Sequence, residues 1–285
     1  MATHRKKHRP LRILFRLLLL AAAGFLFLVW SNTALQTTQF DPVFADLPAG
    51  FDGCRIVVLS DLHGGEFGEE NKRLFRAVEK AEPDYIFYLG DLEDRYRGPT
   101  DGYADSIATG LSAIAPTYYV TGNHEWGIGD VPALKKCLRA GGVTVLENTF
   151  LPLERNGDTI ILAGIDDPNG HADQKTPETV AAEVYAAHGD PFWMLLAHRN
   201  DRCVSQYSYL GADLVFSGHG HGGIFRLPFT DGLFSTDRTL FPSYTSGLYE
   251  ENGSCLFASR GLGNSGPSFR LFNRPEVAVV TLHKG

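Results

Sequence analysis

The chain has 285 residues, enough for one large α/β domain with a short appendage, and its hydrophobic content of 44% excludes a long disordered tract. The formal net charge is −7, although six of the 26 basic residues lie in the first 16 positions and no acidic residue precedes Asp41. With those six set aside, 20 basic residues stand against 33 acidic ones, which argues against a nucleic-acid partner.

The N-terminal segment is first basic and then apolar. Residues 1–16 form a basic tail, and residues 17–35 contain no charged side chain. A membrane-spanning helix needs roughly 20 apolar residues. This segment reaches that length only when the polar residues Ser31, Asn32 and Thr33 near its end are included. A cleaved signal peptide is the alternative, but Asn32 fits the small-residue pattern of a cleavage site poorly. We therefore expect an uncleaved anchor, with residues 1–16 in the cytoplasm and the rest of the chain outside by the positive-inside rule.

A tether is expected over residues 36–53, and strand and helix patterns alternate after it. Strands are predicted at 56–59, 84–89, 117–120, 143–146, 192–197, 214–216, 254–258 and 277–282, with a hairpin of 150–153 and 159–163 around Asn156-Gly157. Helices are predicted at 69–81, around 107–114, at 130–141 and at 178–187. The four cysteines have no metal-binding or disulfide spacing, and we expect buried free thiols.

Polar side chains follow five of these strands directly. Asp61 and His63 come after the first one, and their spacing of two predicts that both side chains point to one face. The others are Asp91, Asn123, His198, His219 and His221. Because α/β sheets build their sites at the carboxyl ends of strands, we expect these side chains to converge. Oxygen and imidazole donors without a thiolate are typical of a metal site.

The ordered set of motifs resembles the calcineurin-like metallophosphoesterases. The motifs are D-x-H at 61–63, G-D-x-x-D at 90–94, G-N-H-E at 122–125, the lone His198 and G-H-x-H at 218–221. The resemblance covers roughly residues 54–282 and so predicts a catalytic domain over residues 54–285. The segments 259–263 and 272–276 are similar to the membrane-associated bacterial branch, the YkuE-like phosphoesterases. The fold implied is a four-layer α-β-β-α sandwich of two mixed sheets flanked by helices, here with an N-terminal transmembrane helix.

The resemblance also implies two divalent metal ions, manganese, iron or zinc, bridged by Asp91. The first ion would be held by Asp61, His63, Asp91 and His221, and the second by Asp91, Asn123, His198 and His219. Two such cations can clamp a phosphate and activate a bridging water to hydroxide. His124 would protonate the leaving oxygen, with Asp94 orienting it, and Glu125 would support the site without acting on the substrate.

The predicted function is a membrane-anchored, extracytoplasmic phosphoesterase that hydrolyses phosphodiester or pyrophosphate bonds. The substrate stays open between a lipid-linked ester, a cell-wall diester and a soluble phosphomonoester, and the oligomeric state is also open. A non-catalytic metal-binding protein is the alternative of a different class. Arg95 and Arg97 could reach a phosphate or lie solvated, while Asp166 and Asp167 are expected in a turn, with pocket lining as the alternative. The aromatic residues of 224–249 are expected either in the pocket wall or in the core.

Overall fold

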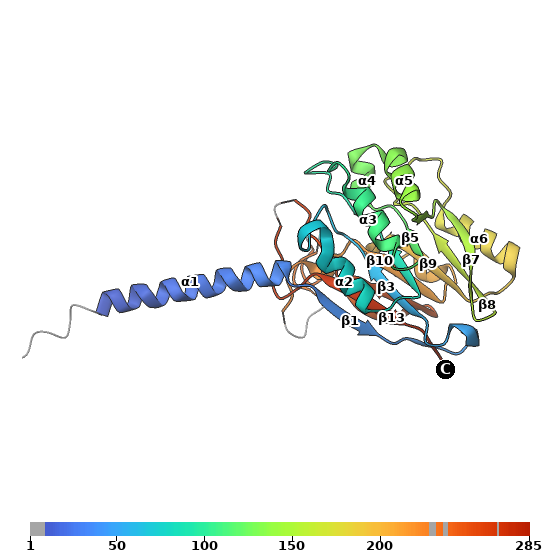
Figure 1. The fold of residues 1–285 in the computed structure, drawn as a ribbon. Helices are drawn as coiled ribbons and strands as arrows, with labels where there is room; N and C mark the ends of the chain where they lie inside the picture. Colours follow the sequence, from blue (N-terminus) through green and yellow to red (C-terminus); the bar gives the residue numbers. More distant parts are fainter. Residues whose placement is uncertain (1–8, 228–231, 236–238, 267) are drawn as a thin grey trace, which may run out of the picture.

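Two six-stranded mixed sheets form the body of the protein, and the computed structural model describes residues 9–227, 232–235, 239–266 and 268–285 (Figure 1). The part of the predicted cytoplasmic tail before residue 9, and Phe229 of the aromatic segment, lie outside the described ranges. A long helix, α1 (Arg9–Thr33), projects from one end of the body.

The first sheet brings three of the predicted site loops to one edge. Its order is β1 (Gln36–Phe40), β13 (Glu276–Thr281), β3 (Arg55–Leu59), β4 (Tyr85–Tyr88), β5 (Thr117–Tyr119) and β6 (Thr144–Val145). Strands β3 to β6 are parallel, so the residues that follow β3, β4 and β5 meet at the same edge. β13 runs antiparallel to β3, and β1 runs parallel to β13. Three helices pack their apolar faces on the outer face: α2 (Lys72–Lys80), α3 (Tyr103–Ser112) and α5 (Val131–Ala140).

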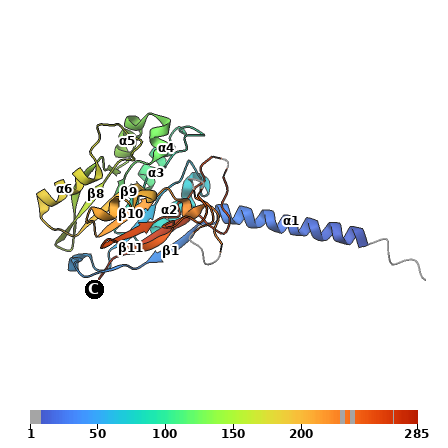
Figure 2. The same cartoon turned by 180° about the vertical axis from the view of Figure 1, so that it is seen from behind.

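The second sheet supplies the remaining site loops. Its order is β11 (Gly247–Glu251), β12 (Ser254–Ala258), β10 (Leu214–Gly218), β9 (Trp193–Arg199), β8 (Asp158–Gly164) and β7 (Thr149–Arg155). The four central strands are parallel, and the two edge strands are antiparallel to their neighbours. Helix α6 (Pro177–His188) covers the outer face (Figure 2).

The main core lies between the two sheets. Alternate side chains of β3 and β4, such as Val58 and Phe87, meet alternate side chains of β9 and β10, such as Leu196 and Phe216. The rings of Phe87 and Phe216 are 5.2 Å apart and nearly perpendicular. Burial of each large apolar side chain contributes about 1.5–3 kcal/mol, so this layer fixes the spacing of the two sheets. The predicted four-layer sandwich is confirmed.

The prediction of a tether over residues 36–53 is wrong for this structure. Gln36–Phe40 forms β1 at the edge of the first sheet, Phe40 packs on Phe257 with ring centroids 5.1 Å apart, and Leu47 and Phe51 are fully buried. A polar edge strand such as Gln-Thr-Thr-Gln-Phe lacks the apolar run that marks a central strand, which is why the sequence pattern missed it. Four more elements were not predicted: α4 (Asn123–Ile128), β11, and the paired strands β2 (Val43–Phe44) and β14 (His283–Lys284).

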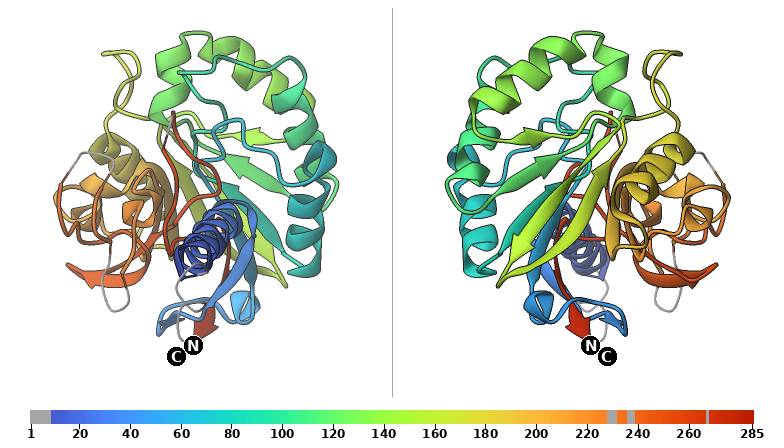
Figure 3. Two further views of the ribbon diagram at one scale, coloured as in Figure 1. Left: turned by 90° about the vertical axis from the view of Figure 1, so that its left-hand side faces the viewer. Right: turned by 90° about the vertical axis from the view of Figure 1, so that its right-hand side faces the viewer.

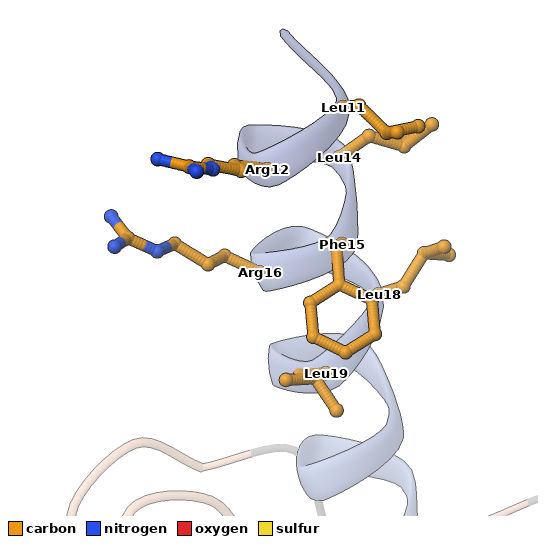
Figure 4. Close-up of a pocket in the computed structure, with 7 residues that line it drawn as sticks. All are labelled: Leu11, Arg12, Leu14, Phe15, Arg16, Leu18 and Leu19. Atoms are coloured by element: carbon orange, nitrogen blue, oxygen red, sulfur yellow. The ribbon is translucent and has the colours of Figure 1, made fainter. Parts of the chain in front are cut away.

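Helix α1 is long and apolar enough to cross a membrane over Leu11–Thr33, judged by length and composition. None of its most apolar stretch is buried against the body, which distinguishes it from the core helix of a soluble protein. Figure 4 shows Leu11, Leu14 and Leu18 on one side of the helix and Arg12 and Arg16 on another. The space between these side chains is lined by α1 alone, so it is helix surface rather than a binding site.

Candidate metal centre

The seven predicted metal ligands lie in one buried cluster where the carboxyl ends of both sheets meet. Asp61 and His63 follow β3, Asp91 follows β4, and Asn123 begins α4 just after β5. His198 lies near the end of β9, and His219 and His221 follow β10. None of the seven is more than 8% exposed. The two sheets therefore contribute donors to a common site, as the strand-end pattern predicted.

One group of donors consists of Asp61, His63 and His221. The Nε2 atoms of His63 and His221 are 3.1 Å apart, and His221 Nε2 is 3.5 Å from Asp61 Oδ1. Ligand atoms of all three residues lie within 4.8 Å of one another. Burial lowers the pKa of His63 to about 3 and raises that of Asp61 to about 6, the latter helped by the charge of Asp91. Neutral imidazole nitrogens and a buried carboxylate pointing at one spot are the arrangement that a cation requires.

A second group consists of Asp91, His198 and His219, with Asn123 beside it. His198 Nε2 lies 3.3 Å from Asp91 Oδ2 and 3.1 Å from Asn123 Oδ1. Burial alone would raise the pKa of Asp91, but the charge and hydrogen bond of His198 outweigh it and hold the pKa well below its usual value. Nδ1 of His198 contacts the Leu89 carbonyl at 2.7 Å, which fixes the ring orientation.

Asp91 connects the two groups. Its Oδ2 atom lies 3.7 Å from His63 Nε2 as well as 3.3 Å from His198 Nε2. A carboxylate in that position has oxygens available to both groups. The buried donor set of carboxylate, amide and imidazole therefore fits a pair of divalent cations with Asp91 between them.

The ligand loops converge for a different reason from the one that the sequence suggested. β3 ends at Leu59, so Asp61 and His63 are not successive same-face positions of a strand. Both have positive φ, 53° and 50°, as do Asp91, His219 and His221. Left-handed backbone costs roughly 1–2 kcal/mol at a residue with a side chain, so tertiary contacts must hold it.

Hydrogen bonds between neighbouring loops supply those contacts. The N–H groups of Asp61, His63 and Gly64 donate to the carbonyls of Gly90, Asp91 and Leu92 at 2.9–3.0 Å. His219 N–H donates to both carboxylate oxygens of Asp61 at 3.1 Å, which ties the second sheet to the first. Gly90 touches the backbone of Gly122 so closely that a Cβ would lie 2.3 Å from Gly122 N, and its φ is +84°. Only glycine allows these two loops to approach.

Glu125 holds the ligand loops together through hydrogen bonds to their backbone. Its carboxylate accepts from the N–H groups of Asp91 at 3.0 Å, Leu92 at 2.7 Å and Gly122 at 2.7 Å. Burial, with the nearby charge of Asp91, raises the pKa of Glu125 to about 7. The role predicted for Glu125, support of the ligands, agrees with these contacts.

His124 stands beside the cluster and is held by Asp94. His124 Nδ1 is 3.1 Å from Asp94 Oδ1, while its Nε2 lies 4.0 Å from Asp91 Oδ2 and 3.3 Å from Ser265 Oγ. Asp94 also accepts from the N–H groups of Tyr96 and Gly266, at 3.1 and 3.0 Å. Burial would raise the pKa of Asp94, but these backbone donors lower it, so the carboxylate can hold the imidazole with Nε2 toward the cluster.

Arg199, which the sequence reasoning did not single out, also faces the cluster. Its Nε atom donates to Asp167 Oδ2 at 2.7 Å, and its Nη1 atom lies 3.3 Å from His219 Nε2. Asp167 was expected in a turn, but its buried carboxylate positions this arginine. The sequence does show a basic residue directly after His198, but no sequence feature indicates that it pairs with Asp167. Asp166 is engaged elsewhere, with Lys135 and Thr121.

A cavity of about 470 Å³ opens next to the metal-ligand cluster. Its lining includes Arg95, Arg199 and Arg270 together with His124 and Ser265. Arg97 lies 3.7 Å from Asp94 and is half exposed. Of the predicted aromatic segment, Phe234 lines the cavity, whereas Tyr244 and Tyr249 contact each other with tilted rings, their centroids 4.9 Å apart. Three arginines beside a cation site favour an anionic ligand such as a phosphoryl group.

Residues 54–223 match the family model described as calcineurin-like phosphoesterase. The chain is 29% identical over 258 residues to the uncharacterized metallophosphoesterase YkuE of Bacillus subtilis, covering 87% of this chain and 85% of that protein. It is also 29% identical over 276 residues to the uncharacterized metallophosphoesterase Cj0846 of Campylobacter jejuni, covering 95% of this chain and 70% of that one.

Two further similarities cover less of the other protein. A zebrafish (Danio rerio) transmembrane protein with metallophosphoesterase domain is 30% identical over 249 residues, 83% of this chain and 54% of that protein. Among solved structures, the sulfate thiohydrolase SoxB of Thermus thermophilus has a TM-score of 0.51 at 14% identity, over 84% of this chain and 58% of that chain. The second likeness concerns the fold alone.

Replacement of the Glu125 carboxylate tests how the ligand loops are held. In Glu125→Gln one acceptor oxygen becomes an NH₂ group that faces backbone N–H donors, so we expect the free energy of unfolding to fall by about 2 kcal/mol. The exposed Glu79→Gln on α2 is the matched control and should unfold like the unaltered chain. Thermal and denaturant unfolding measure both. Equal stability of the two variants would contradict the bracing role.

Proposed function

Because the chain belongs to the calcineurin-like phosphoesterases, a family of metal-dependent phosphoester hydrolases, we propose that it hydrolyses phosphodiester or pyrophosphate bonds of a cell-envelope substrate. The observation that carries this proposal is the convergence of two donor groups on the buried carboxylate of Asp91. The cavity beside it extends beyond the space of a lone phosphoryl group, which favours a substituent on both sides of the phosphorus. A broad phosphomonoesterase is the second candidate within the same chemistry.

The metal ligands in this proposal are divided between the two groups. Asp61, His63, Asp91 and His221 hold one divalent cation, and Asp91, Asn123, His198 and His219 hold the other. Mixed oxygen and nitrogen donors suit manganese, iron or zinc. When bound, such a pair supplies Lewis-acid charge to the phosphoryl oxygens and lowers the pKa of a water so that it becomes nucleophilic near neutral pH.

The side chains of this protein have three tasks around that centre. Arg199, fixed by Asp167, and Arg95 contact the non-bridging oxygens of the phosphoryl group. His124 directs Nε2 to the leaving oxygen and donates a proton as the ester bond breaks. Asp94 keeps the ring in that orientation, since it holds Nδ1 at 3.1 Å.

The N-terminal helix is assigned to the membrane in the same proposal. Its most apolar stretch is not buried against the body, and relatives of this chain include proteins described as transmembrane. Basic side chains at the start of the segment favour the cytoplasm, so the catalytic domain lies outside. The chain is then a single-pass membrane protein with its site in the extracytoplasmic space.

The first prediction tests the metal centre. Metal-loaded protein should contain about two divalent ions per chain and should hydrolyse bis(p-nitrophenyl) phosphate. Asp91→Ala should abolish turnover and lower the occupancy of both sites, as measured by elemental analysis. Lys136→Ala, on the exposed side of α5, is the control. Retention of one full site in Asp91→Ala would argue against a bridging carboxylate, and absence of turnover in the loaded, unaltered chain would refute the enzyme proposal.

The second prediction separates the chemical role of His124 from metal binding. His124→Asn should keep both metals and lose about 100- to 10,000-fold in kcat, because the leaving oxygen no longer receives a proton. The loss should be small for nitrophenyl esters, whose leaving group needs little protonation, and large for alkyl esters. Equal losses for both kinds of ester would limit His124 to binding the phosphoryl group. Loss of a metal would instead make it a ligand.

The third prediction concerns topology. Protease added to spheroplasts should digest the domain from residue 36 onward, because the proposed orientation exposes it. Cells permeabilised with detergent serve as the control for protease sensitivity, and immunoblotting against the C-terminus measures the result. Full protection in spheroplasts, followed by digestion after permeabilisation, would reverse the orientation.

A further inference from the structure

The strand topology requires helix α1 to leave the body at the edge that carries the metal-ligand cluster. β1 begins at Gln36, which pairs with Glu276 at the start of β13. The β13–β3 register pairs Ala278 with Val58, and two residues further along it brings Glu276 opposite Ser60. The first residue of β1 is therefore level with the residue before Asp61. Figures 1 and 3 show α1 emerging from the body at this edge.

The last turns of α1 are docked on the segment that precedes β13. Asn32 Oδ1 accepts from Arg270 N–H at 2.7 Å, and Asn32 Nδ2 donates to the Arg270 carbonyl at 3.0 Å. The ring of Phe27 packs on Phe272 with centroids 5.0 Å apart. The guanidinium of Arg274 lies over the Trp30 ring and donates to the Ala34 carbonyl at 2.9 Å. The helix end thus has a defined position relative to this segment.

The same segment lines the catalytic cavity. Asn264, Ser265, Gly266, Ser268 and Arg270 all contribute to its wall. Asn264 binds Asn32 Oδ1 at 3.1 Å, and the guanidinium of Arg270 lies 3.2 Å from His221 Nδ1. One loop therefore touches the end of the membrane helix on one side and the metal-ligand cluster on the other. In the proposed membrane topology the apolar span ends at Thr33, which would place this loop at the level of the bilayer surface.

Large apolar side chains project from this rim. Phe269 and Phe272 are 48% and 55% exposed, and Leu240 and Phe241 of the neighbouring segment are 63% and 65% exposed. The two segments are linked through Phe225 and Phe234, because Phe234 forms bridges with both Phe225 and Leu240, and the rings of Phe225 and Phe269 are 5.2 Å apart. Exposed aromatic and aliphatic side chains gathered in one place mark an interaction surface, and aromatic residues favour the bilayer interface.

We propose that Leu240, Phe241, Phe269 and Phe272, here called the apolar rim, insert into the headgroup region of the bilayer that α1 spans. The cavity then receives a phosphoester whose apolar part stays in that leaflet. This inference rests on the proposed phosphoesterase function and names its substrate class. The rim takes the lipid side of the substrate, and the arginines of the cavity take its phosphoryl group.

Two substrates with the same leaving group separate the rim from the chemistry. The full chain, loaded with manganese in vesicles, is assayed with bis(p-nitrophenyl) phosphate in solution and with phosphatidyl-p-nitrophenol in the bilayer. Two rim variants are compared, Phe269→Ser/Phe272→Ser and Leu240→Ser/Phe241→Ser, the second of which leaves the contact with Phe27 intact. Val43→Ser on β2 removes an equally exposed apolar side chain, 64% exposed, from the far end of β1.

Both rim variants should lose about tenfold in kcat/KM on the lipid ester, because less apolar surface contacts the bilayer, and should keep the soluble rate within about twofold. Val43→Ser should match the unaltered chain on both substrates. Unchanged lipid rates in the rim variants would overturn the inference. Equal losses on both substrates would overturn it as well, because the rim would then act on the site itself.

A spectroscopic measurement tests whether the apolar rim contacts the membrane, and it does not depend on enzymatic activity. Phe269→Trp should be quenched by brominated lipids in the vesicle beyond the signal of the unaltered chain, and Val43→Trp should not. Quenching of neither residue would refute the membrane contact. If the unaltered chain hydrolyses neither ester, the proposed function fails, and quenching of Phe269→Trp alone would still establish the rim as a membrane surface.

Discussion

The burial of Asp91 between three imidazoles is the constraint on which the rest of the structure depends. A carboxylate without water is costly unless charge and hydrogen bonds compensate it. Here Oδ1 accepts from the backbone N–H of His124 at 2.8 Å, and Oδ2 faces the rings of His63, His198 and, at 4.0 Å, His124. Each strand that positions one of these partners must therefore end close to Asp91. The parallel order β3-β4-β5 and the facing β9-β10 pair provide those ends, and the core between the sheets sets their distance.

The site also depends on backbone that few residues adopt. Five of the seven donors have positive φ, and each would be unfavourable in an isolated loop. The cost is offset by hydrogen bonds between loops, such as the one from His63 N–H to the Asp91 carbonyl and those from three backbone N–H groups to the Glu125 carboxylate. Strain and its compensation are thus distributed over both sheets. Donors held in place by such bonds are what preorganised electrostatic catalysis requires.

The sequence predicted what depends on periodicity and spacing. Buried strands such as Arg55–Leu59 are recognisable as apolar runs. Polar residues directly after such strands indicate a site, because parallel sheets build their sites at the carboxyl ends of the strands. It could not predict the left-handed turn at Asp61, because φ is set by contacts with loops distant in sequence. β1 escaped notice because an edge strand needs only one pairing partner and few apolar residues. The Arg199–Asp167 pair joins two strand ends 32 positions apart, and nothing local in either segment signals the other.

The contacts of α1 bear on the alternative that the sequence left open, an anchor or a cleaved signal peptide. A segment destined for removal contributes nothing to the mature fold and need not fit it. Here Asn32, which matched a cleavage site poorly, pairs with both backbone groups of Arg270, and Ser31 is fully buried. Cleavage after Ala34 would remove those partners and uncover the wall of the catalytic cavity. The residue that weakened the signal-peptide hypothesis is therefore the residue that fastens the helix to the site, and this supports retention of the anchor.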